Sequence, residues 1–230
     1  MLDVALVHDL DRLNFILRGC SRLESFTLRA RSFFSIAEQY LACQNYLWEW
    51  SPASLVESLR MTGLRELVID TRGSELQEKP ESEHLCALGL LRLPSLRSLW
   101  TRARTICREI LDIHPTDKTA PAVPPTFDTI IINLSLKEPD RQSEEHSERC
   151  FGIYCSVGLS YQLKLAAGVV LKVAPNVKMM RIITHELPSL QTVAYDCVTR
   201  QEIELNDDDA ERNWAAEGKV RSDKDELSAP

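Results

Sequence analysis

A six-residue pattern of apolar and polar positions recurs five times along the chain. Its first, fourth and sixth positions are apolar except for Thr101, and its second and third positions are polar. The five segments are residues 23–28, 64–69, 96–101, 127–132 and 190–195. Apolar residues two positions apart indicate a β-strand, because successive side chains point to opposite faces. We therefore predict a strand at each segment and number its positions one to six, with the next residue as position seven.

The spacing of the segments indicates a structural repeat. Their first positions, residues 23, 64, 96, 127 and 190, are separated by 41, 32, 31 and 63 residues. A repeat of about 31 residues accounts for the middle intervals, and the last interval is about twice that length. A further unit is therefore expected between residues 133 and 189, with residues 152–159 as the candidate.

Helical patterns precede the predicted strands. Leu10, Leu13 and Leu17 recur at the three- and four-residue steps of one helix face. A second helix is predicted to begin at Ser51-Pro52 and to end at Gly63, since these residues suit the two ends of a helix. Further helices are predicted near residues 83–93, 104–113 and 177–185. The apolar stretch 163–174 is interpreted as a buried helix.

A helix and a short strand in each repeat predict an α/β fold, an open leucine-rich-repeat-like solenoid with degenerate repeats. Parallel strands would lie on the concave side and helices on the convex side, because each unit buries its apolar face against its neighbours. Positions four and six would point into the stack, while positions three, five and seven face solvent on the concave side. This face is the predicted surface for a protein or peptide partner. Its residues are Arg29, Glu66, Asp70, Trp100, Arg102, Asn133 and Asp196.

The alternative is a doubly wound α/β enzyme of unrecognised class. Buried strands of such a fold are nearly continuous apolar runs, and only residues 130–132 approach that pattern. The eight glycines form neither Gly-x-Gly-x-x-Gly nor a phosphate-binding loop. We therefore expect a non-catalytic interaction module with no catalytic residue and no cofactor site.

Charge divides the chain into a predicted leucine-rich-repeat-like domain, residues 1–200, and an acidic, largely disordered tail, residues 201–230. Ten acidic and four basic residues lie beyond residue 200, which accounts for −6 of the net charge of −7. The nearly neutral body disfavours nucleic-acid binding. A secretory signal and an apolar run of about 18 residues are both absent, so we expect no membrane segment and a cytoplasmic or nuclear location.

Cysteine and histidine spacing does not favour a metal site. The seven cysteines are widely spaced and form no Cys-x-x-Cys pair. Cys150 and Cys155, near His146, are the one candidate group. Their spacing fits no standard zinc motif, so we interpret the cysteines as thiols in a reducing compartment and predict no metal.

Three segments carry a resemblance to a known family. Residues 64–71 read LRELVIDT, residues 93–111 read LPSLRSLWTRARTICREIL, and residues 130–138 read IIINLSLKE. Over about residues 60–200 the chain resembles the leucine-rich C-terminal region of filamentous-fungal F-box-type proteins. The resemblance implies a substrate-receiving domain of a cullin ubiquitin ligase. Such receptors dock on the Skp1 adaptor through an N-terminal F-box, and no F-box pattern precedes Leu23. We therefore expect a truncated relative, a gene-model fragment or a receptor that has lost its F-box, and we do not expect a Skp1-type adaptor as a partner.

Overall fold

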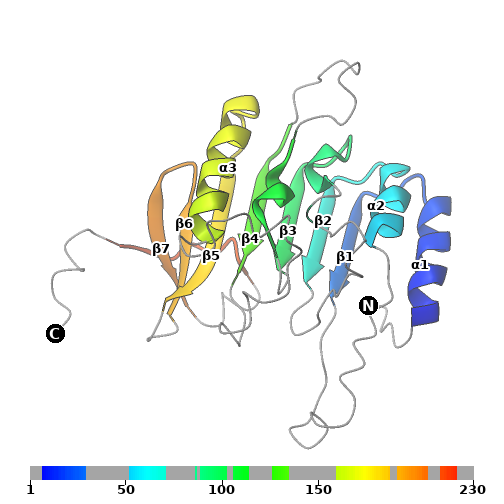
Figure 1. Ribbon diagram of the computed structural model, residues 1–230, viewed down its shortest axis with the longest axis horizontal. Helices are drawn as coiled ribbons and strands as arrows, with labels where there is room; N and C mark the ends of the chain where they lie inside the picture. The colour runs from blue at the N-terminus through cyan, green and yellow to red at the C-terminus, as the bar shows by residue number, and fades with distance from the viewer. Residues whose placement is uncertain are drawn as a thin grey trace, which may run out of the picture.

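The computed structural model describes residues 7–29, 52–70, 86, 89–102, 106–113, 126–134, 159–186, 191–206 and 213–221. These residues form a mixed α/β fold around one eight-stranded sheet, in which the strands lie in chain order (Figure 1). The first five strands are parallel: β1 Ser25–Arg29, β2 Glu66–Asp70, β3 Ser98–Arg102, β4 Thr129–Asn133 and β5 Met179–Glu186. Three antiparallel strands complete the sheet: β6 Gln191–Asp196, β7 Gln201–Leu205 and β8 Lys219–Val220.

The prediction that the first four repeated segments form adjacent parallel strands is confirmed. Position four of each strand lies beside position four of the next, since Phe26 pairs with Leu67, Leu67 with Leu99 and Leu99 with Ile130. The backbone repeats with the same register at the start of each strand. The carbonyl at position two accepts hydrogen bonds from the N–H groups of positions two and three of the next strand, with lengths between 2.8 and 3.1 Å. This arrangement links β1 through β5 without interruption.

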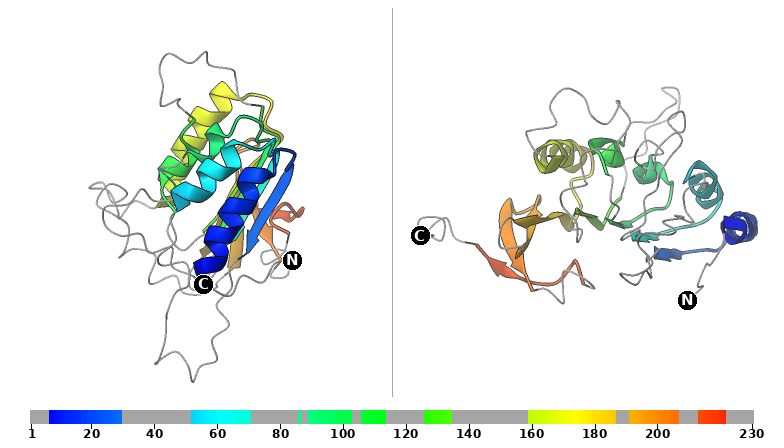
Figure 2. Two further views of the ribbon diagram at one scale, coloured as in Figure 1. Left: turned by 90° about the vertical axis from the view of Figure 1, so that its right-hand side faces the viewer. Right: turned by 60° about the horizontal axis from the view of Figure 1, so that its bottom comes forward.

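The helical elements cover one face of the sheet (Figure 2). They are α1 Val7–Gly19, α2 Pro52–Arg60, α3 Leu159–Val173 and two 3₁₀ turns, η2 Leu90–Arg92 and η3 Arg108–Leu111. The predicted first two helices and the helix over residues 163–174 are confirmed. The helices expected near residues 83–93 and 104–113 are short 3₁₀ turns within their described parts. Pro94 and Ser95 come soon after η2, so the chain turns toward β3 there.

The main core lies between the helical elements and the sheet. Position four was predicted to point into the stack, and Leu67, Leu99 and Ile130 at that position are each 0% exposed. They pack in one cluster with Leu55 and Leu59 of α2 and with α3 side chains. A second, smaller cluster lies on the opposite face of the sheet. Its buried members are Ile131, Ile183, Ala194, Ile203, Leu205 and Trp214.

The region from residue 177 onward differs from the sequence prediction. Residues 177–185 were expected to be helical, but β5 begins at Met179 and is the fifth parallel strand. The proposed hidden unit at residues 152–159 lies outside the described residues except for Leu159, which begins α3. The predicted strand at 190–195 is present as β6, yet it is antiparallel to β5. Only four residues separate β5 from β6, whereas a crossover between parallel strands requires about a dozen.

The segment assigned to an acidic tail contributes to the sheet. The predicted boundary at residue 200 falls at the end of the turn between β6 and β7. Beyond it, β7 and β8 extend the sheet, and Trp214 between them is only 4% exposed. Apolar Ile203 and Leu205 alternate with Glu202 and Glu204, so the acids of this strand accompany a buried face.

Candidate partner-binding face

The candidate site is the face of the sheet opposite the helices, which we call the inner face. Positions three, five and seven of the parallel strands point to it, because positions four and six enter the helix-covered core. The seven residues predicted for this face fall into two groups. Arg29 and Glu66 are exposed and Trp100 is half-buried, whereas Asp70, Arg102, Asn133 and Asp196 are buried.

The prediction that position seven is exposed is therefore wrong for β2, β3, β4 and β6. Asp70 is 5% exposed, Arg102 3%, Asn133 0% and Asp196 7%. The first three residues are direct neighbours across β2, β3 and β4. A buried charge is stable only when it is paired and hydrogen-bonded, and the neighbouring strands provide the partner. Asp70 and Arg102 occupy the same template position on neighbouring strands. The pattern of either strand alone does not predict their pairing, which results from the register between β2 and β3.

Asp70 and Arg102 form a bidentate ion pair. Arg102 Nε donates to Asp70 Oδ1 at 2.9 Å, and Arg102 Nη2 donates to Asp70 Oδ2 at 2.8 Å. Both side chains are almost fully buried. The planar guanidinium matches the two carboxylate oxygens, and this geometry fixes both orientations. The pair consequently joins β2 and β3 beyond their backbone hydrogen bonds.

Trp214 covers this pair from the C-terminal part of the chain. The Arg102 guanidinium carbon lies 5.0 Å from the centroid of the Trp214 ring, within the range of a cation–π interaction. Trp100 stacks on Trp214 with ring centroids 6.1 Å apart, and its own Nε1 donates to Ser98 Oγ at 3.0 Å. The Trp214 Nε1 atom is buried and has no hydrogen-bond partner among the described residues. Trp214 is thus held through its ring.

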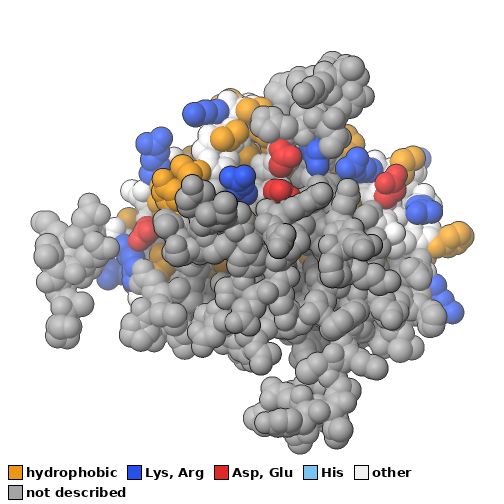
Figure 3. All heavy atoms as spheres, viewed as in Figure 1, with side chains coloured by type: hydrophobic (Ala, Val, Ile, Leu, Met, Phe, Trp, Pro, Cys, Tyr) orange, Lys and Arg blue, Asp and Glu red, His pale blue; other side chains and the backbone are white. Residues whose placement is uncertain are grey.

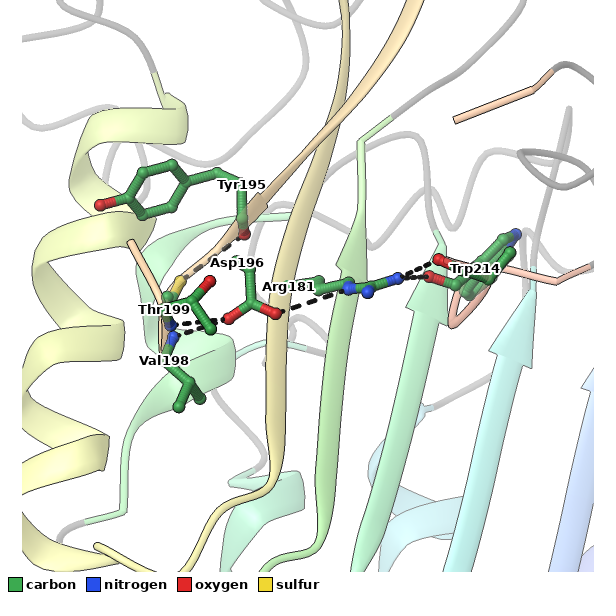
Figure 4. A network of polar contacts seen from close by, with 8 residues as sticks. Arg181, Tyr195, Asp196, Val198, Thr199 and Trp214 are labelled. Carbon is green, nitrogen blue, oxygen red and sulfur yellow. Dashed lines mark hydrogen bonds and ion pairs between the residues drawn. The ribbon is translucent and has the colours of Figure 1, made fainter. Parts of the chain in front are cut away.

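Arg181 of β5 holds the backbone of the same segment (Figure 4). Its Nη1 donates to the carbonyl oxygens of Trp214, at 3.2 Å, and of Ala216, at 2.7 Å. Its Nε lies 3.8 Å from Asp196 Oδ2 on the adjacent strand. Asp196 Oδ1 in turn accepts from the backbone N–H groups of Val198 and Thr199, at 2.9 and 3.1 Å. Asp196 therefore acts as a turn-forming residue paired with a buried arginine.

Sequence reasoning missed Arg181 and Trp214. Both were assigned to the wrong kind of element, Arg181 to a helix and Trp214 to a disordered tail. A usable signal was present for Arg181, because Val177, Met180 and Ile182 occupy positions one, four and six of the template. For Trp214 the signal was weaker. A tryptophan followed by two alanines is an apolar break within an acidic segment.

The described residues contain no group of three or more histidine, cysteine, aspartate or glutamate side chains placed to hold a metal ion. The proposed metal candidates Cys150, Cys155 and His146 lie outside these residues. Among the described cysteines, Cys20, Cys86 and Cys197 are free thiols. In the same part of the chain, no helix has both the length and the apolar character needed to cross a membrane.

Comparison with known proteins gives no relative from which to transfer a function. No family model matches the chain, and no curated protein or solved structure matches it at a significant level.

Proposed function

We propose that this chain is a non-catalytic protein-interaction module, a leucine-rich-repeat-like solenoid that holds a partner on the open part of its inner face. The observation that carries the proposal is the repeated register of β1 to β5. In each strand the backbone carbonyl at position two accepts hydrogen bonds from the next strand, and the apolar side chains at position four form one continuous row. Stacked units of this kind present a long, evenly spaced surface, which suits extended recognition of a protein.

The open part of this face lies on β1, β2 and β3. Thr27, Arg29 and Glu66 are exposed there, while Val68 and Trp100 are half-buried. Charges of both signs beside one accessible aromatic ring are typical of a protein interface, in which tryptophan and arginine contribute most of the binding energy. We therefore assign partner contact to Arg29, Glu66 and the accessible edge of Trp100. The buried Asp70–Arg102 pair does not contact the partner, but it joins the strands β2 and β3 that carry this surface.

The resemblance to F-box-type C-terminal regions gives the proposal a finer form. In this form the partner is a substrate that a cullin ubiquitin ligase receives. A substrate of this kind accumulates when the proteasome is inhibited, whereas a constitutive binding partner keeps its level. Measuring the abundance of a captured partner with and without a proteasome inhibitor separates these two outcomes.

The test of the interaction surface is affinity capture with two charge-neutral double variants. Arg29→Ala with Glu66→Ala removes one base and one acid from the open inner face. Arg18→Ala with Glu57→Ala removes one base and one acid from exposed positions on the helices, and is the matched control. Proteins captured by the wild type are identified, and the affinity of the most enriched one is measured with purified components.

We expect the inner-face variant to weaken that affinity at least tenfold, while the helix variant remains within about twofold. Both should unfold within about 0.5 kcal/mol of the wild type, because exposed substitutions have small effects. Equal affinities for the wild type and the inner-face variant, or a loss confined to the helix variant, would place binding elsewhere.

A further inference from the structure

Helix α3 exposes a row of apolar side chains to solvent. Tyr161, Leu165, Val169 and Val173 recur every four residues and are 55%, 58%, 45% and 43% exposed. The opposite side of the helix packs into the core, since Leu163, Ala167 and Val170 are buried there. Residues four apart lie on one side of a helix, so the row is continuous. The expectation of a buried helix is therefore correct for one face of α3 only.

A pocket lies along the flank of this row. It has a volume of about 320 Å³ and is bounded by α3 and by the turn between β6 and β7. Its lining residues are Lys164, Gly168, Leu171, Lys172, Tyr195, Cys197 and Arg200. In space-filling view, hydrophobic side chains gather over α3 with lysine and arginine side chains beside them (Figure 3). The apolar row and the pocket thus form one surface, which we call the α3 surface.

Gly168 lies inside α3 and on the wall of the pocket. A glycine within a helix destabilises it by about 1 kcal/mol relative to alanine. Within the described fold nothing requires the absence of a side chain, because a Cβ added at Gly168 would meet no atom within 4 Å. The glycine keeps the pocket open and allows another chain to approach the helix backbone closely.

The α3 surface is positively charged, although the whole chain has a net charge of −7. Helix α3 contains two lysines and no acidic residue, and Arg200 projects from the facing turn. Lys164 Nζ lies 4.0 Å from the centroid of the Tyr195 ring and 3.6 Å from Glu202 Oε1. Arg200 is exposed, and so is Lys172 in the last turn of α3. Burial, with the neighbouring Asp196 charge, raises the pKa of Cys197 to about 12, so this thiol adds no negative charge at neutral pH.

We propose that the α3 surface binds an acidic amphipathic helix of a partner protein. Apolar side chains of that helix pack along Tyr161, Leu165, Val169 and Val173, in the manner of a helix laid against a groove. Carboxylates on its edge reach Lys172 and Arg200 beside the pocket. Opposite charges at the rim select the partner and set its orientation.

The shape and charge of this surface argue against two other occupants. A second copy of the chain would bring the same three cations of each molecule toward one another across a twofold axis, and like charges in contact are unfavourable. A lipid bilayer presents a flat surface to a peripheral helix, which leaves the pocket of about 320 Å³ unfilled. An amphipathic helix has side chains that enter such a pocket.

The test uses a pair of synthetic peptides and the full chain. The acidic peptide has about 18 residues, long enough to follow α3, with leucine on one face and glutamate elsewhere. Its twin carries lysine at every glutamate position. Fluorescence anisotropy measures the affinity of each peptide. We expect the wild type to bind the acidic peptide at least tenfold more tightly than the twin, and Lys172→Glu with Arg200→Glu to reverse this preference.

Two further variants separate the apolar row from the pocket. Leu165→Gln with Val169→Gln removes the middle of the row, and Gly168→Leu fills the pocket. Each should weaken binding of the acidic peptide at least tenfold. Gly168→Leu should also raise Tm, because leucine favours a helix more than glycine does. Phe15→Gln with Ile16→Gln is the matched control, since these residues are 81% and 56% exposed on α1. This control should leave binding unchanged.

Several results would overturn the proposal. They are equal binding of both peptides, an effect of the α1 control equal to that of the α3 variants, or unchanged binding by both α3 variants. Binding of anionic vesicles that Leu165→Gln abolishes would assign the surface to a membrane, and a dimer that the same change dissociates would assign it to a second copy. The inner-face variant Arg29→Ala with Glu66→Ala should bind the acidic peptide as the wild type does. Failure at one surface is therefore distinguishable from failure at the other.

Discussion

The inner face of the sheet differs between its N-terminal and C-terminal halves. On β1 to β3, positions three and five are exposed or half-buried, as Thr27, Glu66 and Val68 illustrate. At position five of β4 and β5 the same face is closed, because Ile131 is 0% exposed and Arg181 is 5% exposed, next to the segment that carries Trp214. Position five thus lies at the surface in one half and in the core in the other.

The difference arises from the course of the chain after the fifth parallel strand. Beyond β5 the chain reverses into antiparallel strands, and Trp214 returns over the inner face. Arg102 and Arg181 meet it there, one through its ring and the other through its backbone. In the C-terminal half the strands are therefore covered on both faces, by the main core on one side and by the small cluster around Trp214 on the other. Only the N-terminal half retains an open inner face.

The largest expected effect is at position seven. Arg102→Ala should lower the free energy of unfolding by about 3–5 kcal/mol, because it leaves the Asp70 carboxylate buried without its ion-pair partner. Arg29→Ala, at the same position of β1, should change it by about 0.5 kcal/mol or less, since Arg29 is exposed. Urea unfolding followed by circular dichroism measures both. Similar losses for the two variants would show that the cover of Trp214 over Arg102 does not distinguish it from the open position of Arg29.

Position five gives a second matched pair. Ile131→Ala removes a fully buried side chain beneath the Trp214 segment and should cost about 2–5 kcal/mol. Val68→Ala removes a half-buried side chain on the open half and should cost about 1 kcal/mol. The comparison again uses denaturant unfolding midpoints at constant m-value. A Val68→Ala loss as large as that of Ile131→Ala would mean that the open half is covered as well.

The repeated strands were predictable because their signal is local and occurs several times. The spacing of Leu23, Leu64, Leu96 and Phe127 placed four strands in the correct register and identified Leu67, Leu99 and Ile130 as core. The fifth parallel strand was missed because its first position, Val177, lies 50 residues beyond Phe127. Helix α3 and the residues before it lengthen this unit well past the repeat of about 31 residues.

The inner face was harder to predict than the strands. Alternation along a strand states which side a residue faces, but not whether another segment covers that side. Asp70 and Arg102 were correctly assigned to the inner face and incorrectly assumed to be exposed. Their burial depends on Trp214, more than a hundred residues further along the chain. Contacts of this range leave no periodic pattern in the sequence.

The stacked tryptophans offer a more sensitive measure of the boundary between the halves. Trp100 belongs to the open half and Trp214 to the segment that closes the other, and their ring centroids are 6.1 Å apart. A double-mutant cycle with Trp100→Ala and Trp214→Ala should give a coupling energy of about 0.5–1.5 kcal/mol, as for other aromatic pairs. Equilibrium unfolding of the four proteins provides the value. A coupling energy near zero would mean that Trp214 closes its half independently of Trp100.

The smallest effect is expected at the other end of the strands, where the charges at position two are exposed. Asp128 at the start of β4 forms ion pairs with Lys178, at 2.7 Å, and with Arg97, at 3.7 Å. The hydrogen bond from Lys178 is the main cause that holds the pKa of Asp128 below its ordinary value. A carboxylate whose pKa is lower in the folded state stabilises the fold at pH values above its unfolded pKa of about 3.9. That contribution is lost as the pH falls through the folded pKa.

Asp128→Asn should therefore be slightly less stable than the wild type at pH 7, and the difference should disappear in acid. Thermal unfolding between neutral and acidic pH measures this trend, and a difference that grew toward acid would contradict it. Because these charges are exposed and screened by solvent, the row at position two contributes little, in contrast to the buried Asp70–Arg102 pair at position seven.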